Sequence, residues 1–312
     1  MSDFTYAFNA VFPLFVYMAL GMIIKKLNWA TDQTFNQMNT ITFKTFLPIM
    51  IFVNIYHSSL EEFPGIMTVL YPIVAISLTF VIAWFFVDRT GLEFREKGVV
   101  TQAIFRSNYV LFGVPLVLAL IDGKTTGITE VLLATIIPLF NVYAVIILSW
   151  YGGQKVNGKE VVRKIITNPL ILASVLGILA KWIHLSLPEP LESSLSSLGK
   201  IATPMALIIL GAQFRFADSG KYARKLVTIC SLRLLIVPAA LLSGAALLGM
   251  RGEAMISYLP LFGGPVAVSS YTMAYQMGAD DQLAGQILVY TSALCLPALF
   301  MFIVILRKLA LI

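Results

Sequence analysis

The residues with the clearest chemical character lie in one short stretch, Arg106 to Pro115. This stretch belongs to an apolar segment long enough to cross a bilayer, yet it contains the cation Arg106, the amide Asn108, Gly113 and Pro115. Proline removes a backbone donor and crowds the preceding turn, and glycine permits a break in a helix. The backbone groups freed by a break need protein, water or a solute as partner, because hydrocarbon offers none. The stretch therefore predicts a polar, solute-facing break, which we place at Gly113 and Pro115.

A second stretch of the same character lies in the other half of the chain. It reads Pro-Leu-Phe-Gly-Gly-Pro, and its Gly263, Gly264 and Pro265 predict another break. Two interrupted apolar segments in corresponding positions of two halves are the best sequence indication of a transporter's binding site. We expect the two segments to cross, with half-helix N-termini, each carrying roughly half a positive charge, directed at the membrane midplane.

Arg106 and Asn108 are the main candidates for contact with a solute. An arginine near the middle of a bilayer costs roughly 2.5–3.5 kcal/mol on insertion scales; the alternatives for Arg106 are snorkelling to the headgroups or pairing with backbone groups. An internal ion pair is not expected, because the interiors of the apolar segments contain no Asp or Glu. Asn108 offers donors and an acceptor to a solute or, alternatively, to the broken backbone. The candidate substrate-binding residues are Arg106, Asn108, Tyr109, Gly113, Pro115, Gly263, Gly264, Pro265, Asn141, Lys44 and Lys200.

Composition places these residues in an integral membrane protein. Of the 312 residues, 58% are hydrophobic and 12% charged, with a mean hydropathy of +0.86, whereas a soluble domain has about 25% charged residues. A membrane span needs roughly 20 apolar residues. Ten ranges meet this length: 7–27, 35–56, 66–87, 98–121, 128–151, 165–186, 192–214, 223–249, 254–277 and 283–306. The first is read as a spanning helix and not as a signal peptide, because no basic residue precedes it.

The distribution of basic residues predicts the orientation. Connections after the odd-numbered spans hold thirteen Lys and Arg residues, and the opposite side holds five. The positive-inside rule therefore places both termini outside and the polar loop 152–164 in the cytoplasm. Because the cations occupy short loops between apolar spans, the net charge of +6 is explained by orientation and does not indicate nucleic-acid binding.

The two halves of the chain resemble each other in register. In each half a proline near the start of the first span is followed 35 residues later by a second proline, and a lysine precedes that second proline by four residues. These residues are Pro13, Lys44 and Pro48 in residues 1–151, and Pro169, Lys200 and Pro204 in residues 165–312. An odd number of spans per half inverts the second copy. The sequence therefore predicts an all-α polytopic membrane protein of ten transmembrane helices in two inverted five-helix repeats, with broken, crossing helices 4 and 9.

The residue types favour a carrier of anions over an enzyme. The sequence contains no HExxH, G-x-S-x-G or P-loop motif and no paired intramembrane aspartates, and it indicates no cofactor and no metal site. An interior with cations, amides and hydroxyls but no acids suits a negatively charged solute. The lack of interior acids argues against proton coupling through carboxylates. The matched pair Lys44 and Lys200 either adds positive charge to this interior or snorkels to the surface.

The sequence at these positions resembles the auxin efflux carrier family, in its compact prokaryotic form often described as malate or malonate permeases. The similarity covers nearly all ten spans. Its most specific part is the stretch Ser107–Pro115, which is similar to the family's crossover motif of an asparagine followed by a proline, with a glycine two residues before the proline. Further matches are Phe46-Leu47-Pro48, Ala202 to Leu207 with Leu210-Gly211, and Leu294 to Pro297.

The resemblance implies a two-domain, elevator-like carrier similar in fold to the bile-acid sodium symporters. Spans 1, 2, 6 and 7 would form a scaffold that dimerises, and spans 3–5 and 8–10 would carry solute at the crossover of spans 4 and 9. By motif, Asn108 and Pro115 match the family's site asparagine and crossover proline, and Pro265 matches the second crossover proline. The loop 152–164 is far shorter than the regulatory loop of plant auxin carriers, so hormone transport and its control by phosphorylation are not implied.

These observations together predict a secondary active transporter or facilitator of small organic anions, with malate- or malonate-like carboxylates as substrates, in the inner (plasma) membrane. One alternative is a sodium-coupled carrier of larger amphipathic acids, with Asn141, Gln213 or backbone carbonyls holding the ion. A second alternative is an anion channel or solute sensor. Coupling to Na⁺ or to H⁺ is left open, and a homodimer is implied by the resemblance alone.

Overall fold

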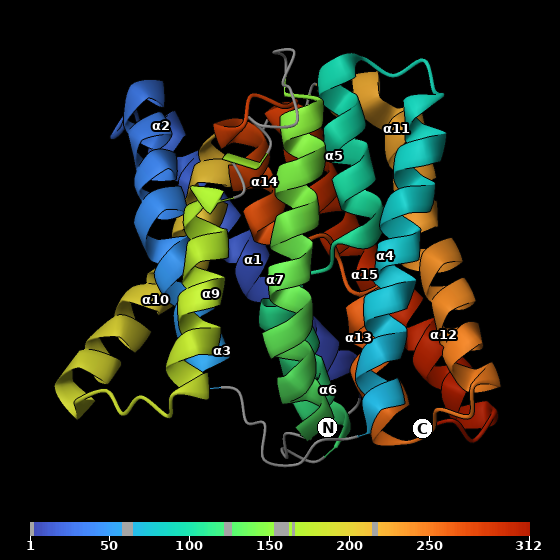
Figure 1. Ribbon diagram of the computed structural model, residues 1–312. Helices are drawn as coiled ribbons and strands as arrows, with labels where there is room; N and C mark the ends of the chain where they lie inside the picture. The colour runs from blue at the N-terminus through green and yellow to red at the C-terminus, as the bar shows by residue number, and fades with distance from the viewer. Residues whose placement is uncertain (1–2, 58–64, 122–126, 153–161, 164–165, 214–217) are drawn as a thin grey trace.

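The computed structural model of this chain is a bundle of helices (Figure 1) and describes residues 3–57, 65–121, 127–152, 162–163, 166–213 and 218–312. The continuous helices are α1 (Asp3–Lys26), α4 (Ile66–Asp88), α7 (Gly127–Trp150), α9 (Pro169–Trp182), α10 (Glu189–Gln213) and α15 (Asp281–Lys308). Two segments run through a short π-helix (η), namely α2 (Asp32–Ile41), η1 (Thr42–Phe46) and α3 (Leu47–His57), and α11 (Asp218–Ser231), η3 (Leu232–Ile236) and α12 (Val237–Leu247). Two further segments are interrupted by extended chain, namely α5 (Phe94–Phe105), η2 (Tyr109–Gly113) and α6 (Val114–Leu120), and α13 (Glu253–Gly263) and α14 (Val268–Gln276).

The helices occupy the ranges that the apolar runs predict. In the described part of the chain, six helical segments are long and apolar enough to cross a membrane: Asp32–His57, Ile66–Asp88, Val131–Trp150, Glu189–Ala212, Gly220–Leu247 and Asp281–Lys308. The prediction of an all-helical protein with several membrane-spanning helices is therefore confirmed. The count of ten spans and the inversion of the two halves stay predictions. Most of the expected cytoplasmic loop, residues 153–161 and 164, lies outside the described residues.

Each of the three π-helices is followed by a proline at the second position of the next helix. These prolines are Pro48, Pro115 and Pro238. A proline ring clashes with the carbonyl four residues earlier and offers no N–H to it, and a widened π turn relieves that clash. The break that we placed at Gly113 and Pro115 is therefore a widened turn, and the prediction of its position is wrong. The chain is interrupted earlier, at Arg106–Asn108, while the second interruption directly follows Gly263.

One group of helices is formed by α1, α3, α9 and α10. Helix α1 packs along α10, and α3 packs against α9 and α10; α3, α9 and α10 lie side by side at the left of Figure 1. Two glycines allow α1 and α10 to approach closely. A Cβ atom at Gly21 would lie 1.9 Å from the carbonyl oxygen of Ile208, and one at Gly211 would lie 2.0 Å from that of Met18.

The remaining helices pack mainly with one another. Helices α4, α5 and α7 form one cluster, α11 and α14 pack on α15, and α12 packs on α13. Aromatic rings hold the first cluster together: Phe80 of α4 stacks on Tyr143 of α7 with centroids 4.4 Å apart, and Phe105 of α5 meets Phe80 edge-on at 5.4 Å. The two groups meet where α6 and α15 contact α1, α7 contacts α9, and α14 contacts α10. The division into a scaffold and a transport domain stays a prediction.

Candidate functional site

The two interrupted helix segments meet where their extended parts run past each other. The first extended part is Arg106–Asn108, between α5 and η2, and the second is Gly264–Ala267, between α13 and α14. The backbone N–H of Asn108 donates to the carbonyl oxygen of Pro265 at 2.8 Å, and the adjacent residues form an isolated antiparallel bridge. This pairing, which we call the crossover, satisfies backbone groups that the helix ends leave free.

Two side chains from other helices bind the backbone of the crossover. The N–H of Val266 donates to the hydroxyl of Thr291 on α15 at 3.2 Å. Arg233 of η3, whose side chain is 1% exposed, donates from Nε to the carbonyl oxygen of Gly264 at 3.1 Å and from Nη1 to that of Ile104 at 3.3 Å. Ile104 lies in the last turn of α5, where the carbonyls lack helical partners and carry partial negative charge. Arg233 therefore joins the two interrupted segments and does not reach the surface.

A small cavity lies between the crossover and helices α3 and α10. Its volume is about 50 Å³, which gives room for roughly three to five water molecules. Leu47, Met50, Ile51 and Thr203 line it from α3 and α10. The other lining residues are Arg106 to Val110, Ile137, Phe140 and Asn141 of α7, and Ala267 to Ser269. The first residues of both half-helices that leave the crossover, η2 and α14, therefore belong to the cavity wall.

Arg106 is 4% exposed and is bound by neutral side chains. Its Nη2 donates to Oδ1 of Asn141 at 2.7 Å and to Oγ of Ser269 at 2.8 Å, and its Nη1 lies 2.9 Å from Sδ of Met273. Within the described residues no carboxylate contacts this guanidinium. Arg106 therefore does not snorkel, and its charge is buried without a counter-ion among the described residues, which is costly.

The cavity wall also contains polar atoms without a partner among the described residues. Among them are the amide nitrogens of Asn108 and Asn141 and the hydroxyl of Ser107, all buried. A buried donor left unpaired costs about 1–3 kcal/mol. The backbone carbonyl of Asn108 is already engaged, because it accepts from the N–H groups of Phe112 and Gly113 at 3.1 Å. The side-chain nitrogens of the two asparagines, in contrast, have no hydrogen-bond partner among the described residues.

The structure brings some of the predicted site residues together and separates others. The predicted residues that line the cavity are Arg106, Asn108, Tyr109 and Asn141. Those that belong to the interrupted segments without lining the cavity are Gly113, Pro115, Gly263, Gly264 and Pro265. Lys44 on η1 and Lys200 on α10 are exposed and do not line it, as the snorkelling alternative predicts. The side chain of Gln213 lies outside the described part of the chain.

Two contacts of this region, and one ion pair near the start of α5, were not expected from the sequence. Met273 lies four residues after Ser269, on the same face of α14, and this spacing was the available signal for its contact with Arg106. Thr203 enters the cavity wall from α10, which only the packing of distant helices reveals. Glu96 is 1% exposed and pairs with Lys225. Helix α5 begins at Phe94, four residues before the expected span, and Glu96 lies in this additional turn.

The fold, with several membrane-spanning helices and a cavity lined by some polar side chains at a crossover of interrupted helices, is that of an integral membrane protein of the transporter class. A family model described as "Membrane transport protein" matches residues 6–303. The chain therefore belongs to this family of membrane transport proteins, the auxin efflux carrier family. It is a multi-pass transporter and not an enzyme.

Two curated relatives come from Oryza sativa subsp. japonica. The "Probable auxin efflux carrier component 5a" is 26% identical over 157 residues, which cover 48% of this chain and 43% of that protein. The "Probable auxin efflux carrier component 5c" is 28% identical over 152 residues, which cover 46% of this chain and 40% of that protein. The matched region thus spans less than half the length of each of these relatives.

Proposed function

We propose that this transporter carries small organic anions, of the malate or malonate class, through the cavity at the crossover. The observation that carries the proposal is the buried guanidinium of Arg106. It has no acidic partner among the described residues, and it lines the cavity beside the amides of Asn108 and Asn141. A guanidinium binds a carboxylate through short, charge-assisted hydrogen bonds, and the two neutral amide donors can add further hydrogen bonds to it.

The charge at the cavity suits a substrate with two carboxylates. The half-helices that begin at η2 and α14 place their first residues in the cavity wall, and each helix N-terminus is equivalent to roughly half a positive charge. Arg233 offsets the partial negative charge of the C-terminal ends of α5 and α13, because it binds carbonyls at both. Together with Arg106 the two N-termini then give roughly two positive charges, which match the charge of a dicarboxylate at neutral pH.

The volume and the position of the cavity favour an alternating-access mechanism of the elevator type. A cavity of about 50 Å³ holds a few water molecules but not a dicarboxylate. One wall comes from Leu47, Met50 and Thr203 of the group that contains α1, α3, α9 and α10, and the other comes from the crossover. In the proposed cycle the group that contains the crossover slides along the first group, which opens the cavity to one side of the membrane at a time.

The proposal includes the membrane arrangement of the chain. It has ten spans in two inverted repeats of five, in the plasma membrane, with both termini outside and with dimerisation through the helices around α1 and α10. The helix boundaries support the ten spans, and the excess of Lys and Arg after the odd-numbered spans supports the orientation.

The test is uptake of labelled malate by liposomes that contain the purified protein, with and without a sodium gradient and a pH gradient. We expect saturable uptake by the wild type, a strong reduction of it in Asn108→Ala, and its retention in Lys26→Gln, which removes an exposed cation that does not line the cavity. Acceleration by one gradient identifies the coupling ion. Failure of malate, malonate and related dicarboxylates to enter under any gradient would overturn the substrate class. Uptake of larger amphipathic acids in their place would favour the sodium-coupled alternative.

Trapped unlabelled substrate separates a carrier from a channel. A carrier exchanges internal for external substrate, so preloaded liposomes should accumulate label faster than empty ones. Equal rates in loaded and empty liposomes would count against alternating access. The measurement needs no variant, and it is therefore independent of the assignment of Asn108.

A further inference from the structure

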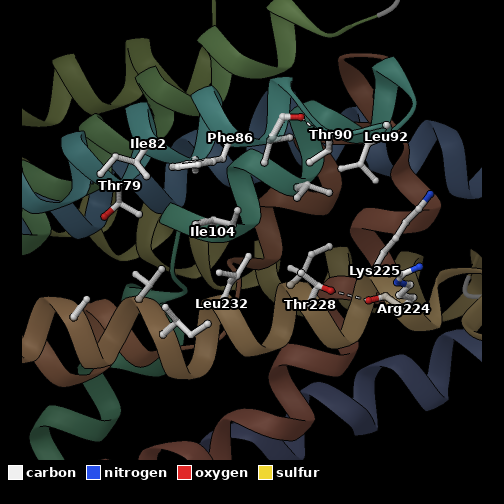
Figure 2. A pocket seen from close by; sticks show the side chains of 18 of the residues that line it. Thr79, Ile82, Phe86, Thr90, Leu92, Ile104, Arg224, Lys225, Thr228 and Leu232 are labelled. Atoms are coloured by element: carbon white, nitrogen blue, oxygen red, sulfur yellow. Dashed lines mark hydrogen bonds between the residues drawn. The ribbon is translucent and has the colours of Figure 1, made fainter.

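A long groove lies between α4 and the segment α11–η3–α12, and it shares no lining residue with the cavity at the crossover. Its volume is about 830 Å³, and most of its lining is apolar. Figure 2 shows Arg224 and Lys225 together at one end of the groove and Thr79 and Ile82 at the other. The groove thus has an apolar body and a cationic end.

The polar residues within the body of the groove leave it apolar in character. The hydroxyls of Thr79, Thr90 and Thr228 each donate to a backbone carbonyl three or four residues earlier, at 2.6–3.0 Å. The hydroxyl hydrogens of these threonines are therefore used in local hydrogen bonds to the backbone, and the lining of the groove as a whole is mainly apolar. Such a surface suits a hydrocarbon chain.

The groove opens sideways, where a membrane helix meets lipid. Ile82 and Phe86 of α4 and Ile236 of η3 line it, and their side chains are 54%, 64% and 56% exposed. From Arg224 to Leu241 the helical segment rises about 25 Å, at 1.5 Å per residue. One leaflet of the hydrocarbon core is about 15 Å thick, so an acyl chain that starts at the cationic end fits within the groove.

The cationic end suits a negatively charged head group. Lys225 donates to the buried carboxylate of Glu96, which offsets its charge. Arg224 is exposed, and its guanidinium has no hydrogen-bond partner among the described residues. This end lies on the side where Lys and Arg are most abundant, which the positive-inside rule makes cytoplasmic. Basic pockets between membrane helices on the cytoplasmic side bind anionic lipid head groups.

We propose that this groove is a binding site for one anionic glycerophospholipid, with its phosphate against Arg224 and Lys225 and an acyl chain between α4 and α12. The site has a consequence for the crossover, because Val100 and Ile104 of α5 also line the groove. The carbonyl of Ile104 is held by Arg233, which binds the second interrupted segment as well. A lipid in the groove therefore packs against the helix that carries one end of the crossover.

The first test measures the charge preference with the purified full-length protein in a non-ionic detergent. Native mass spectrometry compares retention of phosphatidylglycerol and phosphatidylcholine with identical acyl chains. We expect phosphatidylglycerol to bind more tightly than phosphatidylcholine. Arg224→Gln should lower the affinity for phosphatidylglycerol about fivefold, which is the effect of one interfacial cation, and should leave the affinity for phosphatidylcholine unchanged. Lys26→Gln, an exposed cation expected on the same side, is the control. Equal retention of the two lipids by the wild type, or an unchanged preference in Arg224→Gln, would overturn the proposal.

The second test locates the acyl chain with two neighbouring alanines of α12. Both are exposed, but Ala240 lines the groove and Ala239 does not. Ala240→Trp fills the groove and should release the bound lipid, whereas Ala239→Trp should retain it. Equal retention in the two variants would place the lipid elsewhere. In another contrary outcome, soluble glycerol phosphate displaces phosphatidylglycerol while Ala240→Trp still retains the lipid fully. That pair of results would show that only the phosphate is bound, at the surface, and would overturn the proposal that the groove holds an acyl chain.

Discussion

The backbone N–H of Asn108 donates to the carbonyl oxygen of Pro265 at 2.8 Å, which joins two interrupted helices that lie 157 residues apart in the chain. This bond sets the relative position of the two half-helices that begin beside it. Arg106 lines the cavity next to this junction, and Arg233 binds carbonyls of both segments without lining it. The two buried arginines therefore differ in their surroundings: Arg106 faces the cavity, where we propose that it binds the solute, and Arg233 holds the crossover together.

Replacement of Arg106 by alanine should weaken the binding of organic anions more than it harms folding. The guanidinium has no carboxylate partner among the described residues, so its removal leaves no acid uncompensated, and its contacts are to neutral groups. A hydrogen bond to a charged group contributes about 1.5–3 kcal/mol, which corresponds to an affinity loss of about ten- to hundredfold. Competition against labelled uptake gives the affinity, and the midpoint of thermal unfolding reports folding. Unchanged affinity in a well-folded variant would remove Arg106 from the site.

Asn108→Asp should impair anion uptake more severely than Asn108→Ala. Aspartate has nearly the same shape, but it replaces the unpartnered amide donor by an acceptor and adds a negative charge to the cavity. That charge would pair with Arg106 and repel a carboxylate. The check is the Michaelis constant and the maximal rate of uptake for both variants, with Lys26→Gln as control. Equal impairment by the two substitutions would show that the loss of the amide, which both share, causes the defect, and that the negative charge of the aspartate adds nothing to it.

The apolar segments of the sequence largely determine the helix positions, because a span needs a minimum length of apolar residues whatever it packs against. The position of the first break was not predicted correctly. Pro115 is accommodated at the second position of a helix after a widened turn, and it does not interrupt the chain. The interruption lies earlier, at Arg106–Asn108. Gly264 and Pro265 marked the second interruption correctly, because an extended segment begins there.

The candidate site was predictable where a polar residue type is unusual in an apolar run. Arg106, Asn108 and Asn141 stand out in this way, and the structure places all three on one cavity. Lys44 and Lys200 stand out equally, but a repeat in register does not say which face of a helix a side chain occupies, and both are exposed. The contacts of Thr203 and Arg233 depend on the packing of distant helices, which no local pattern encodes.

Arg233→Gln should lower the thermal stability and the maximal transport rate without changing the affinity for the anion. The substitution leaves the buried carbonyls of Ile104 and Gly264 unpaired, at a cost of about 1–3 kcal/mol each. Arg251→Gln is the matched control, because Arg251 also donates to two backbone carbonyls but is exposed, so that water replaces it. Thermal unfolding and uptake kinetics on the two variants make the comparison. A weaker affinity in Arg233→Gln at wild-type stability would instead assign this arginine to the substrate.

Gly264→Ala should destabilise the protein, whereas Gly220→Ala should stabilise it slightly. A Cβ atom at Gly264 would lie 2.5 Å from the backbone carbonyl oxygen of Pro260, in the turn where α13 ends, and nothing lies within 4 Å of the corresponding position at Gly220. Overpacking of this kind costs about 1–3 kcal/mol, and alanine is favoured over glycine within a helix such as α11 by about 0.5–1 kcal/mol. The two variants should therefore shift the midpoint of thermal unfolding in opposite directions. A neutral Gly264→Ala would mean that the end of α13 relaxes without disturbing the bond between Asn108 and Pro265, and uptake by that variant should then be normal.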